Sequence, residues 1–329
     1  MQNKPLNIGV DLGGTQIKFG VTNRSGRVIS RHTIRTAPET GPDGIISAIA
    51  ASLQVVVKRA GATVSQINSL GVGIPGTTDS RNGTVVFAPN IFWRDVEFIK
   101  KMRSLYDGRL YIAQDSRAAA WGEYVVGAGK GLSSIASITL GTGVGCGKVI
   151  DGKIFNGALN TAGEFGHQIV ELEGNLCNCG RTGCLEAHAG GLAIVSEAKA
   201  RIVDLNDLLH KSQSDISAKD IFDLAQQGHG EARKLTARVV RYIGIGLVNL
   251  INLNSPELIS ISGGIANAPS ELLLEALIAF VRSRAYPAIS AKVRICKSPF
   301  AEDASLVGAS LLHRQMLPDH HPLSPCVCS

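Results

Sequence analysis

Four residues of metal-ligating type lie close together in the stretch GEFGHQIVELEGNLCNCGRTGCLEAH, which spans residues 163–188. They are His167, Cys177, Cys179 and Cys184. Three thiolates and an imidazole are a donor set of tetrahedral zinc, and a site closed by four protein ligands is structural. The alternatives are free buried thiols or a disulfide, but four such residues at this density rarely coincide by chance. The sequence therefore predicts a structural Zn²⁺ site.

Two carboxylates accompany the predicted zinc ligands. Glu164 lies three residues before His167, and Glu186 lies two residues after Cys184. A structural metal fixes the loop around it and orients the side chains nearby. We therefore expect the zinc site to hold Glu164, His167 and Glu186 in place for a separate role.

Three glycine-rich turns follow predicted strands and favour a bound nucleotide. Their sequences are DLGGT (11–15), LGTGVGCG (140–147) and SGGI (262–265). The backbone N–H groups of such turns can approach phosphate oxygens closely, although a single turn would equally suit an ordinary hairpin. Three of them, two with a threonine, predict a nucleotide clamped between two lobes. The chain has no GxxxxGK[ST] loop, and its first turn returns into a hairpin, so neither a P-loop nor a Rossmann site is expected.

Two aspartates stand at positions suited to phosphate chemistry. Asp11 and Lys18 flank the first glycine turn, and Asp11 is placed to hold Mg²⁺ directly or through water. Asp115 follows a predicted strand and precedes a predicted helix, where a catalytic carboxylate at the edge of a cleft would stand. The alternative for Asp115 is a helix-capping residue.

Composition describes a globular protein large enough for two domains. The chain has 329 residues, 44% hydrophobic and 18% charged. The net charge of +6 comes from scattered basic residues, which are typical of solvated faces and not of a nucleic-acid-binding stripe. No apolar run approaches eighteen residues and the N-terminus lacks a signal-peptide core, so we expect no membrane segment and a cytoplasmic location. Seven cysteines in such a chain favour metal binding or free thiols.

The order of elements predicts an internally duplicated α/β fold. Residues 6–26 and 135–152 each read as strand, glycine turn with a threonine, strand and tight turn, and a third strand is expected at 27–35. Strands alternating with helices indicate mixed or mostly parallel sheets covered by helices. Further strands are expected at 69–74, 109–113, 258–262 and 293–296. Helices are expected at 45–59, 96–106, 116–126, 192–201, 218–226, 231–252, 270–284 and 303–314.

Six motifs together resemble those of the ROK family of bacterial sugar kinases. They are DLGGTQIK (11–18), GVGIPG (71–76), APN (88–90), TLGTGVGCGKVIDGKIFNG (139–157), GEFGH (163–167) and CNCGRTGCLEA (177–187). The resemblance covers residues 6 to about 315. It implies the α/β actin/hexokinase-like (ribonuclease H-like) fold of two lobes with a cleft between them. Many ROK members are repressors with an N-terminal helix-turn-helix, but this chain begins its first strand at residue 6 and so resembles the kinases.

The resemblance also implies domain limits. Residues 1–117 would form a small N-terminal lobe, completed by a C-terminal helix at 303–315. Residues 118–302 would form a large lobe that carries the zinc loop, 163–188. Residues 318–329, rich in proline and polar side chains, are expected to be a flexible tail. A homodimer is the usual assembly of ROK kinases.

The reaction implied is ATP-dependent phosphorylation of a hexose at its 6-hydroxyl, most nearly that of a glucokinase. Asp115 would be the general base, and the histidine and three cysteines would bind the zinc. Residues implied to hold the sugar are Gly76, Asn90, Gln114, Asp115, Glu164, His167 and Glu186. Residues implied to surround ATP and Mg²⁺ are Asp11, Gly13, Gly14, Thr15, Lys18, Gly141, Thr142, Gly143, Gly263 and Gly264.

One departure from the family pattern falls beside the predicted base. The family usually has Asn-Asp-x-Asn, whereas this chain has Gln114, Asp115, Ser116 and Arg117. The change would alter sugar preference, or Arg117 would pair with a nearby carboxylate. The alternatives are therefore an N-acetylglucosamine, N-acetylmannosamine or fructose kinase, and, outside enzymes, a sugar-responsive regulatory protein of the same fold. Either ATP or polyphosphate would be the donor.

Overall fold

The structure is a computed structural model that describes residues 5–315, so the predicted tail at 318–329 lies outside the described residues. Within the described part, the chain forms two compact units. The first unit comprises 5–115 with 306–315, and the second comprises 116–305. The lobe limits expected from the resemblance stay a prediction.

The first unit is built on a five-stranded sheet in the order β3-β2-β1-β4-β8. Its strands are β1 (Leu6–Leu12), β2 (Gln16–Thr22), β3 (Val28–Arg35), β4 (Ile67–Ile74) and β8 (Leu110–Gln114). The first three strands are antiparallel neighbours, whereas β4 runs parallel to β1, and β8 runs parallel to β4. The carboxyl ends of β1, β4 and β8 therefore meet at one edge, where ligands of such sheets usually bind.

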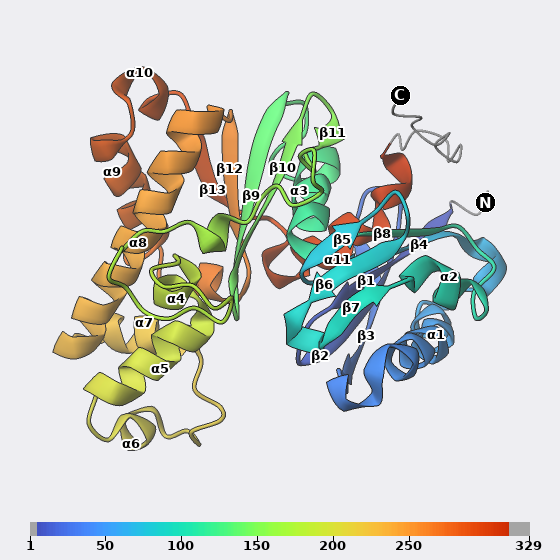
Figure 1. Cartoon of the computed structure of the whole chain (residues 1–329), viewed down its shortest axis with the longest axis horizontal. Coiled ribbons are helices and arrows are strands. Elements are labelled where there is room, and N and C mark those ends of the chain that lie inside the picture. The colour runs from blue at the N-terminus through green and yellow to red at the C-terminus, as the bar shows by residue number, and fades with distance from the viewer. Residues whose placement is uncertain (1–4, 316–329) are drawn as a thin grey trace, which may run out of the picture. The chain divides into compact units, whose positions relative to one another are not determined.

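Helix α1 (Gly41–Arg59) packs against β2 and β3 (Figure 1). It buries Ile45, Ile49, Leu53 and Val56, at the spacing of one helical face, in the core of the first unit. The segment Pro38–Arg59 is long and apolar enough to pass for a membrane span by length and composition, with 39% of its most apolar window buried. Core helices of globular domains commonly pass the same test.

The second unit repeats the sheet of the first. Its order is β11-β10-β9-β12-β13, with β9, β10 and β11 antiparallel and β12 and β13 parallel to β9. Its strands are β9 (Ser134–Leu140), β10 (Val144–Ile150), β11 (Lys153–Ile154), β12 (Leu258–Ser262) and β13 (Arg294–Lys297). Asp151 and Gly152 both have positive φ, as a two-residue hairpin turn requires. Because both sheets place their strands in the same order, the duplicated α/β fold predicted from sequence is confirmed.

Helices surround the second sheet. They are α3 (Asp115–Val126), α4 (Glu186–Ala189), α5 (Gly191–Arg201), α6 (Leu205–Leu209), α7 (Ala218–Gln226), α8 (Gly230–Asn254), α9 (Leu274–Arg284) and α10 (Pro287–Ser290). The long helix α8 lies beside α7 and α9 (Figure 1). A Cβ atom added to Gly244 of α8 would lie 2.5 Å from the Phe280 ring, and one added to Gly246 would lie 2.9 Å from Phe165. Both glycines therefore permit close packing.

The C-terminal helix α11 (Ala304–Ser310) packs on the sheet of the first unit through residues 306–310. A Cβ atom added to Gly9 of β1 would lie 2.0 Å from the Leu306 carbonyl oxygen. One added to Gly71 of β4 would lie 1.9 Å from the carbonyl oxygen of Ala309. The two glycines thus let a helix backbone rest directly on the strands.

Several predicted elements have different bounds in the structure. The helix expected at 45–59 begins earlier, at Gly41. The helix expected at 96–106 is only α2 (Phe98–Arg103), because the preceding residues form β7 (Trp93–Val96). This strand belongs to a small antiparallel sheet with β5 (Thr77–Asp79) and β6 (Thr84–Ala88), which the sequence did not suggest. The helix expected from 270 begins at Leu274, and the helix expected to reach 314 ends at Ser310.

Candidate functional site

The four predicted zinc ligands lie together in the second unit. The ligand atoms of His167, Cys177, Cys179 and Cys184 all lie within 4.8 Å of one another. The sulfurs of Cys179 and Cys184 are 3.7 Å apart, much farther than the bond of about 2.05 Å in a disulfide. All four residues offer the sulfur and nitrogen donors that zinc prefers, so the donor set fits a structural Zn²⁺ ion.

Glycines and short backbone hydrogen bonds shape the loop that carries the cysteines. The Cys177 N–H donates to the Arg181 carbonyl at 2.7 Å, and the Gly180 N–H donates to the Cys177 carbonyl at 2.9 Å. Gly180 and Gly183 have φ of +84° and +77°. A Cβ atom on Gly183 would lie 1.9 Å from the Glu171 carbonyl oxygen. A larger residue at 183 would therefore disturb the loop that brings Cys177 and Cys184 together.

The imidazole of His167 stands between the thiols and a carboxylate. Its Nδ1 atom is 3.8 Å from the Cys177 sulfur, and its Nε2 atom is 4.0 Å from Oε2 of Glu164. One ring nitrogen thus faces the cysteine cluster while the other faces the predicted sugar-binding carboxylate. A metal on Nδ1 would fix the orientation of the ring and hence of its second nitrogen.

The residue before Glu164 must be glycine for the backbone to turn as it does. Gly163 has φ of +100°, and a Cβ atom there would lie 2.4 Å from the Cys146 carbonyl oxygen on β10. The chain from Glu164 then makes a short 3₁₀ turn, Phe165–His167, with Phe165 buried. Cys146 itself is fully enclosed, and burial raises the pKa of its thiol to about 12, so it is an inert packing residue at physiological pH.

Glu186 lies against the second glycine turn. Its Oε2 atom accepts a hydrogen bond of 2.8 Å from the Val144 backbone N–H. A Cβ atom on Gly143 would lie only 2.2 Å from the same oxygen. The absence of a side chain at 143 therefore admits the carboxylate, and a predicted sugar ligand touches a predicted nucleotide turn. The sequence did not reveal this contact, since 42 residues separate the two partners.

The other predicted nucleotide residues of the second unit gather at the same turn. The Gly141 N–H donates to the Gly143 carbonyl at 3.0 Å, and the Gly191 N–H at the start of α5 donates to the Gly141 carbonyl at 2.8 Å. Gly263, at the end of β12, has φ of +93° and lies against the backbone of Leu140. Thr142 and Gly264 are the chain neighbours of these residues, so all five predicted positions share one end of the sheet.

The first glycine turn has the same form. Asp11 and Lys18 face each other in the register of β1 and β2, and the Gly13 N–H donates to the Gln16 carbonyl at 3.0 Å. The N–H of Thr36, the residue after β3, donates to the Thr15 carbonyl at 2.9 Å and so ties the turn to the end of that strand.

The predicted sugar ligand Asn90 lies beside this first turn. It belongs to the 3₁₀ turn Pro89–Ile91, and a Cβ atom on Gly14 would lie 3.4 Å from its Cβ atom. The predicted nucleotide and sugar residues of the first unit are therefore neighbours as well.

The remaining predicted residues of the first unit lie at the carboxyl ends of parallel strands. Gly76 follows β4, has φ of +82° and lies against the Phe87 carbonyl. Gln114, the last residue of β8, pairs with Ile74 in the parallel register and is 7% exposed. Asp115 is the first residue of α3, so this helix begins one residue before the predicted start. The roles predicted for these residues stay predictions.

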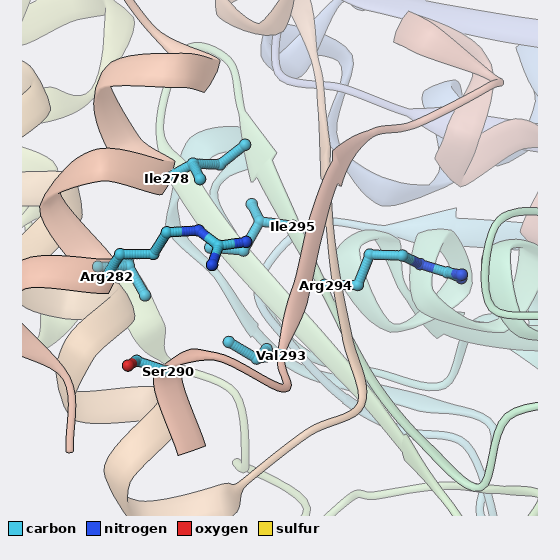
Figure 2. A pocket seen from close by; sticks show the side chains of 7 residues that line it. Ile278, Arg282, Ser290, Val293, Arg294 and Ile295 are labelled. Carbon is cyan, nitrogen blue, oxygen red and sulfur yellow. The ribbon is translucent and has the colours of Figure 1, made fainter. Parts of the chain in front are cut away.

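Two cavities lie away from all of these residues, in the second unit. The smaller, about 100 Å³, is lined from α9, α10 and β13, with the Arg282 side chain reaching toward Ile295 (Figure 2). The larger, about 600 Å³, shares Val293 and Arg294 with it and includes Lys292. No predicted site residue lines either cavity.

The chain has clear relatives of known structure and sequence. The sequence model of the ROK family matches residues 7–316. A glucokinase from Streptomyces coelicolor is 36% identical over 273 residues, which are 80% of this chain and 83% of the relative. A xylose repressor from Caldicellulosiruptor bescii is 30% identical over 92% of this chain and 76% of its own length. The ROK glucokinase of Streptomyces griseus, solved with glucose and AMPPNP, is 33% identical with a TM-score of 0.80, and the match covers 93% of this chain and 98% of that one.

Proposed function

The chain belongs to the ROK family and is a sugar kinase, and we propose that it transfers the terminal phosphoryl group of ATP to the 6-hydroxyl of glucose. The observation that carries the proposal is the position of His167, with one nitrogen toward the cysteine cluster and the other toward Glu164. Such an arrangement gives a carboxylate and an imidazole fixed orientations, which suits recognition of sugar hydroxyls. The choice of glucose is supported by relatives that are named glucokinases.

In the proposed mechanism, Asp115 accepts the proton of the sugar hydroxyl as that oxygen attacks the terminal phosphorus of ATP. Glu164, His167 and Glu186 orient the sugar through its other hydroxyls, with Gly76, Asn90 and Gln114 as further contacts. Phosphoryl transfer asks the protein mainly for positioning and for stabilisation of charge. The glycine turns would let backbone N–H groups other than those of Gly13 and Gly141, which bond within their turns, approach the phosphates.

Two metal ions have different places in this proposal. Mg²⁺, when bound with ATP, neutralises phosphate charge, and Asp11 would hold it directly or through water. Zn²⁺ would be held by His167 and the three cysteines and would stabilise the loop without taking part in the reaction. The homodimer and the cytoplasmic location stay predictions.

A panel of hexoses tests the substrate. ADP release would be measured with glucose, N-acetylglucosamine, N-acetylmannosamine and fructose, with ATP and with polyphosphate as donors. The proposal expects the highest kcat/KM for glucose and ATP, with glucose 6-phosphate as the product. A higher kcat/KM for another sugar would replace glucose by that sugar, and absence of turnover with all of them would favour a regulatory protein.

Replacing the proposed base tests the mechanism. Asp115→Asn should lower kcat by about 10²-fold or more, as expected for loss of general-base catalysis, while glucose affinity stays close to that of the wild type. Glucose affinity would be measured by calorimetry without ATP. Substantial turnover in this variant would show that another group accepts the proton.

A further inference from the structure

We propose that Arg117 is a positioning residue of the sugar site, which holds the loop at 155–163 and so fixes where Glu164 stands. The inference rests on the proposed function, because it takes Glu164 as a sugar ligand. Arg117 lies on α3, two residues after Asp115, and only 1% of it is exposed. Burying a guanidinium ion is costly unless its N–H groups find partners. A buried arginine at this position is therefore stable only where its N–H groups are hydrogen-bonded.

The guanidinium group donates to two backbone carbonyls of one loop. Nη2 of Arg117 donates to the Asn160 carbonyl at 2.8 Å and to the Ala162 carbonyl at 2.9 Å, and Nε donates to the Ala162 carbonyl at 3.3 Å. These partners lie 43 and 45 residues away in the sequence. A planar fork of N–H donors can bind neighbouring carbonyls in this way, which neither the point charge of lysine nor the short side chain of asparagine can reproduce.

The loop that Arg117 holds has little else to fix it. Between β11 and the 3₁₀ turn at Phe165 the structure assigns no helix or strand. Its own hydrogen bonds run from the Ala162 N–H to the Asn156 carbonyl at 3.0 Å and from the Asn160 N–H to the Gly157 carbonyl at 3.4 Å. In the part of the chain that the structure describes, the hydrogen bonds that join residues 157–162 to other elements come from Arg117.

The anchored carbonyl lies next to the functional segment. Ala162 is followed by Gly163, whose positive φ turns the chain sharply, and then by Glu164. The direction in which the chain leaves Ala162 therefore determines where the Glu164 side chain begins. On the other side, the Nδ1 atom of His167 lies 3.8 Å from the Cys177 sulfur, within the predicted metal site. Arg117 and the predicted metal thus hold the two ends of one short segment, 163–167, whose carboxylate the proposed function assigns to the sugar.

The test combines kinetics with hydrogen exchange. Arg117→Gln should raise the KM for glucose by about tenfold, since small misplacements of binding groups cost one to two orders of magnitude. The KM for ATP should stay within about twofold of the wild type. Backbone amides in peptides that cover 155–168 should exchange faster, and those in the two sheets should not. Arg117→Lys, which keeps the charge but offers a point donor, should fall between the wild type and Arg117→Gln.

A stability control separates positioning from general damage. Val239→Ala removes a fully buried methyl pair from α8 and should lower the unfolding temperature while leaving both KM values unchanged. If Arg117→Gln behaves like Val239→Ala, Arg117 only supports the fold and the inference is wrong. Equal increases in both KM values, or unchanged exchange at 155–168, would overturn it as well.

Failure of the proposed function would be recognised separately in the wild-type protein. If another hexose is the substrate, the same KM comparison is made with that sugar. If no hexose is turned over, calorimetric sugar affinity of the wild type and of Arg117→Gln decides: a loss of affinity in the variant supports the inference. Equal affinity, or no sugar binding by either protein, overturns it.

Discussion

Replacement of Gly143 by alanine offers a test of how the predicted sugar ligand Glu186 is held. The new Cβ atom would lie 2.2 Å from Oε2 and 3.0 Å from the carboxyl carbon of Glu186. Real Cβ atoms do not approach this closely, so one of the two groups must move. The carboxylate is the end of a flexible side chain, whereas Gly143 is part of a hydrogen-bonded turn. Gly143→Ala should therefore displace Glu186 and leave the fold in place.

The size of the effect follows from the hydrogen bond that would be lost. The Val144 N–H donates to Oε2 of Glu186 at 2.8 Å. A hydrogen bond to a charged group contributes about 1.5–3 kcal/mol. If the displaced carboxylate stabilises the transition state by about 2 kcal/mol less, kcat/KM for glucose should fall about 30-fold, since each 1.36 kcal/mol is a factor of ten. The loss should be mainly in the KM for glucose, and the unfolding temperature should fall by several degrees, because the same hydrogen bond contributes about 2 kcal/mol to the folded protein.

The assay is steady-state kinetics with glucose and ATP varied in turn, beside thermal unfolding. Gly230→Ala is a matched control, because a Cβ atom at the start of α8 would meet nothing within 4 Å. It should leave kinetics and stability near the wild type. A kcat/KM for glucose within about twofold of the wild type in Gly143→Ala would refute the reasoning, because the carboxylate would then not depend on that turn for its position.

Two further predictions concern the metal and a buried carboxylate. Elemental analysis should find about one zinc per chain. Cys184→Ser, or removal of the metal by a chelator, should lower the unfolding temperature by about 5 °C or more, since loss of a bound metal removes several kcal/mol of stability. A metal-free protein that is active and equally stable would contradict this prediction. Glu123 is fully buried, its Oε2 accepts the Ala128 N–H at 3.0 Å, and burial raises the pKa of its carboxyl above the ordinary 4.5. A raised folded-state pKa means that the stability this group provides is lost as the pH rises through that pKa. Glu123→Gln should therefore raise the unfolding temperature at neutral pH and above, and this increase over the wild type should become smaller toward pH 4.5. An increase that is constant across this pH range would show that the pKa of Glu123 is not raised in the folded protein.

The duplicated sheets could be predicted from sequence because their signals are local. A glycine turn between two apolar runs, and the pair Asp151 and Gly152 at a hairpin, each specify a neighbouring strand pair. The small sheet that ends at Val96 could not be predicted in this way. Its strands are short, and Phe92 and Asp95 adopt left-handed φ values of +58° and +51°, which interrupt any simple periodicity.

Contacts between residues far apart in the chain could not be predicted from the sequence, because they depend on tertiary packing. The four predicted zinc ligands, which the structure brings together, could be recognised because they lie within one segment and the chemistry of their side chains is specific. Arg117 was noticed as unusual, but its binding to the Asn160 and Ala162 carbonyls depends on how α3 lies against a loop 43–45 residues later. The Glu186 contact with Val144 has the same origin. Residue type identified the candidates, and tertiary packing determined their partners.

The loop on the sugar side shows why polar anchors are needed where they occur. Phe165 and Leu185 are buried in the core, but three large apolar residues between them are exposed, with Ile169 at 58%, Leu172 at 78% and Leu176 at 74%. Burial of apolar surface therefore contributes little between these two anchors, at residues 169–176, since the hydrophobic effect scales with the area removed from water. The ordering entropy of the loop must then be offset by other bonds, and metal ligation is the strongest available. Phe165 anchors the segment to the core between Glu164 and His167. The predicted Zn²⁺ site on one side and the buried guanidinium of Arg117 on the other would therefore hold the exposed side chains of Glu164 and His167, which the core does not reach.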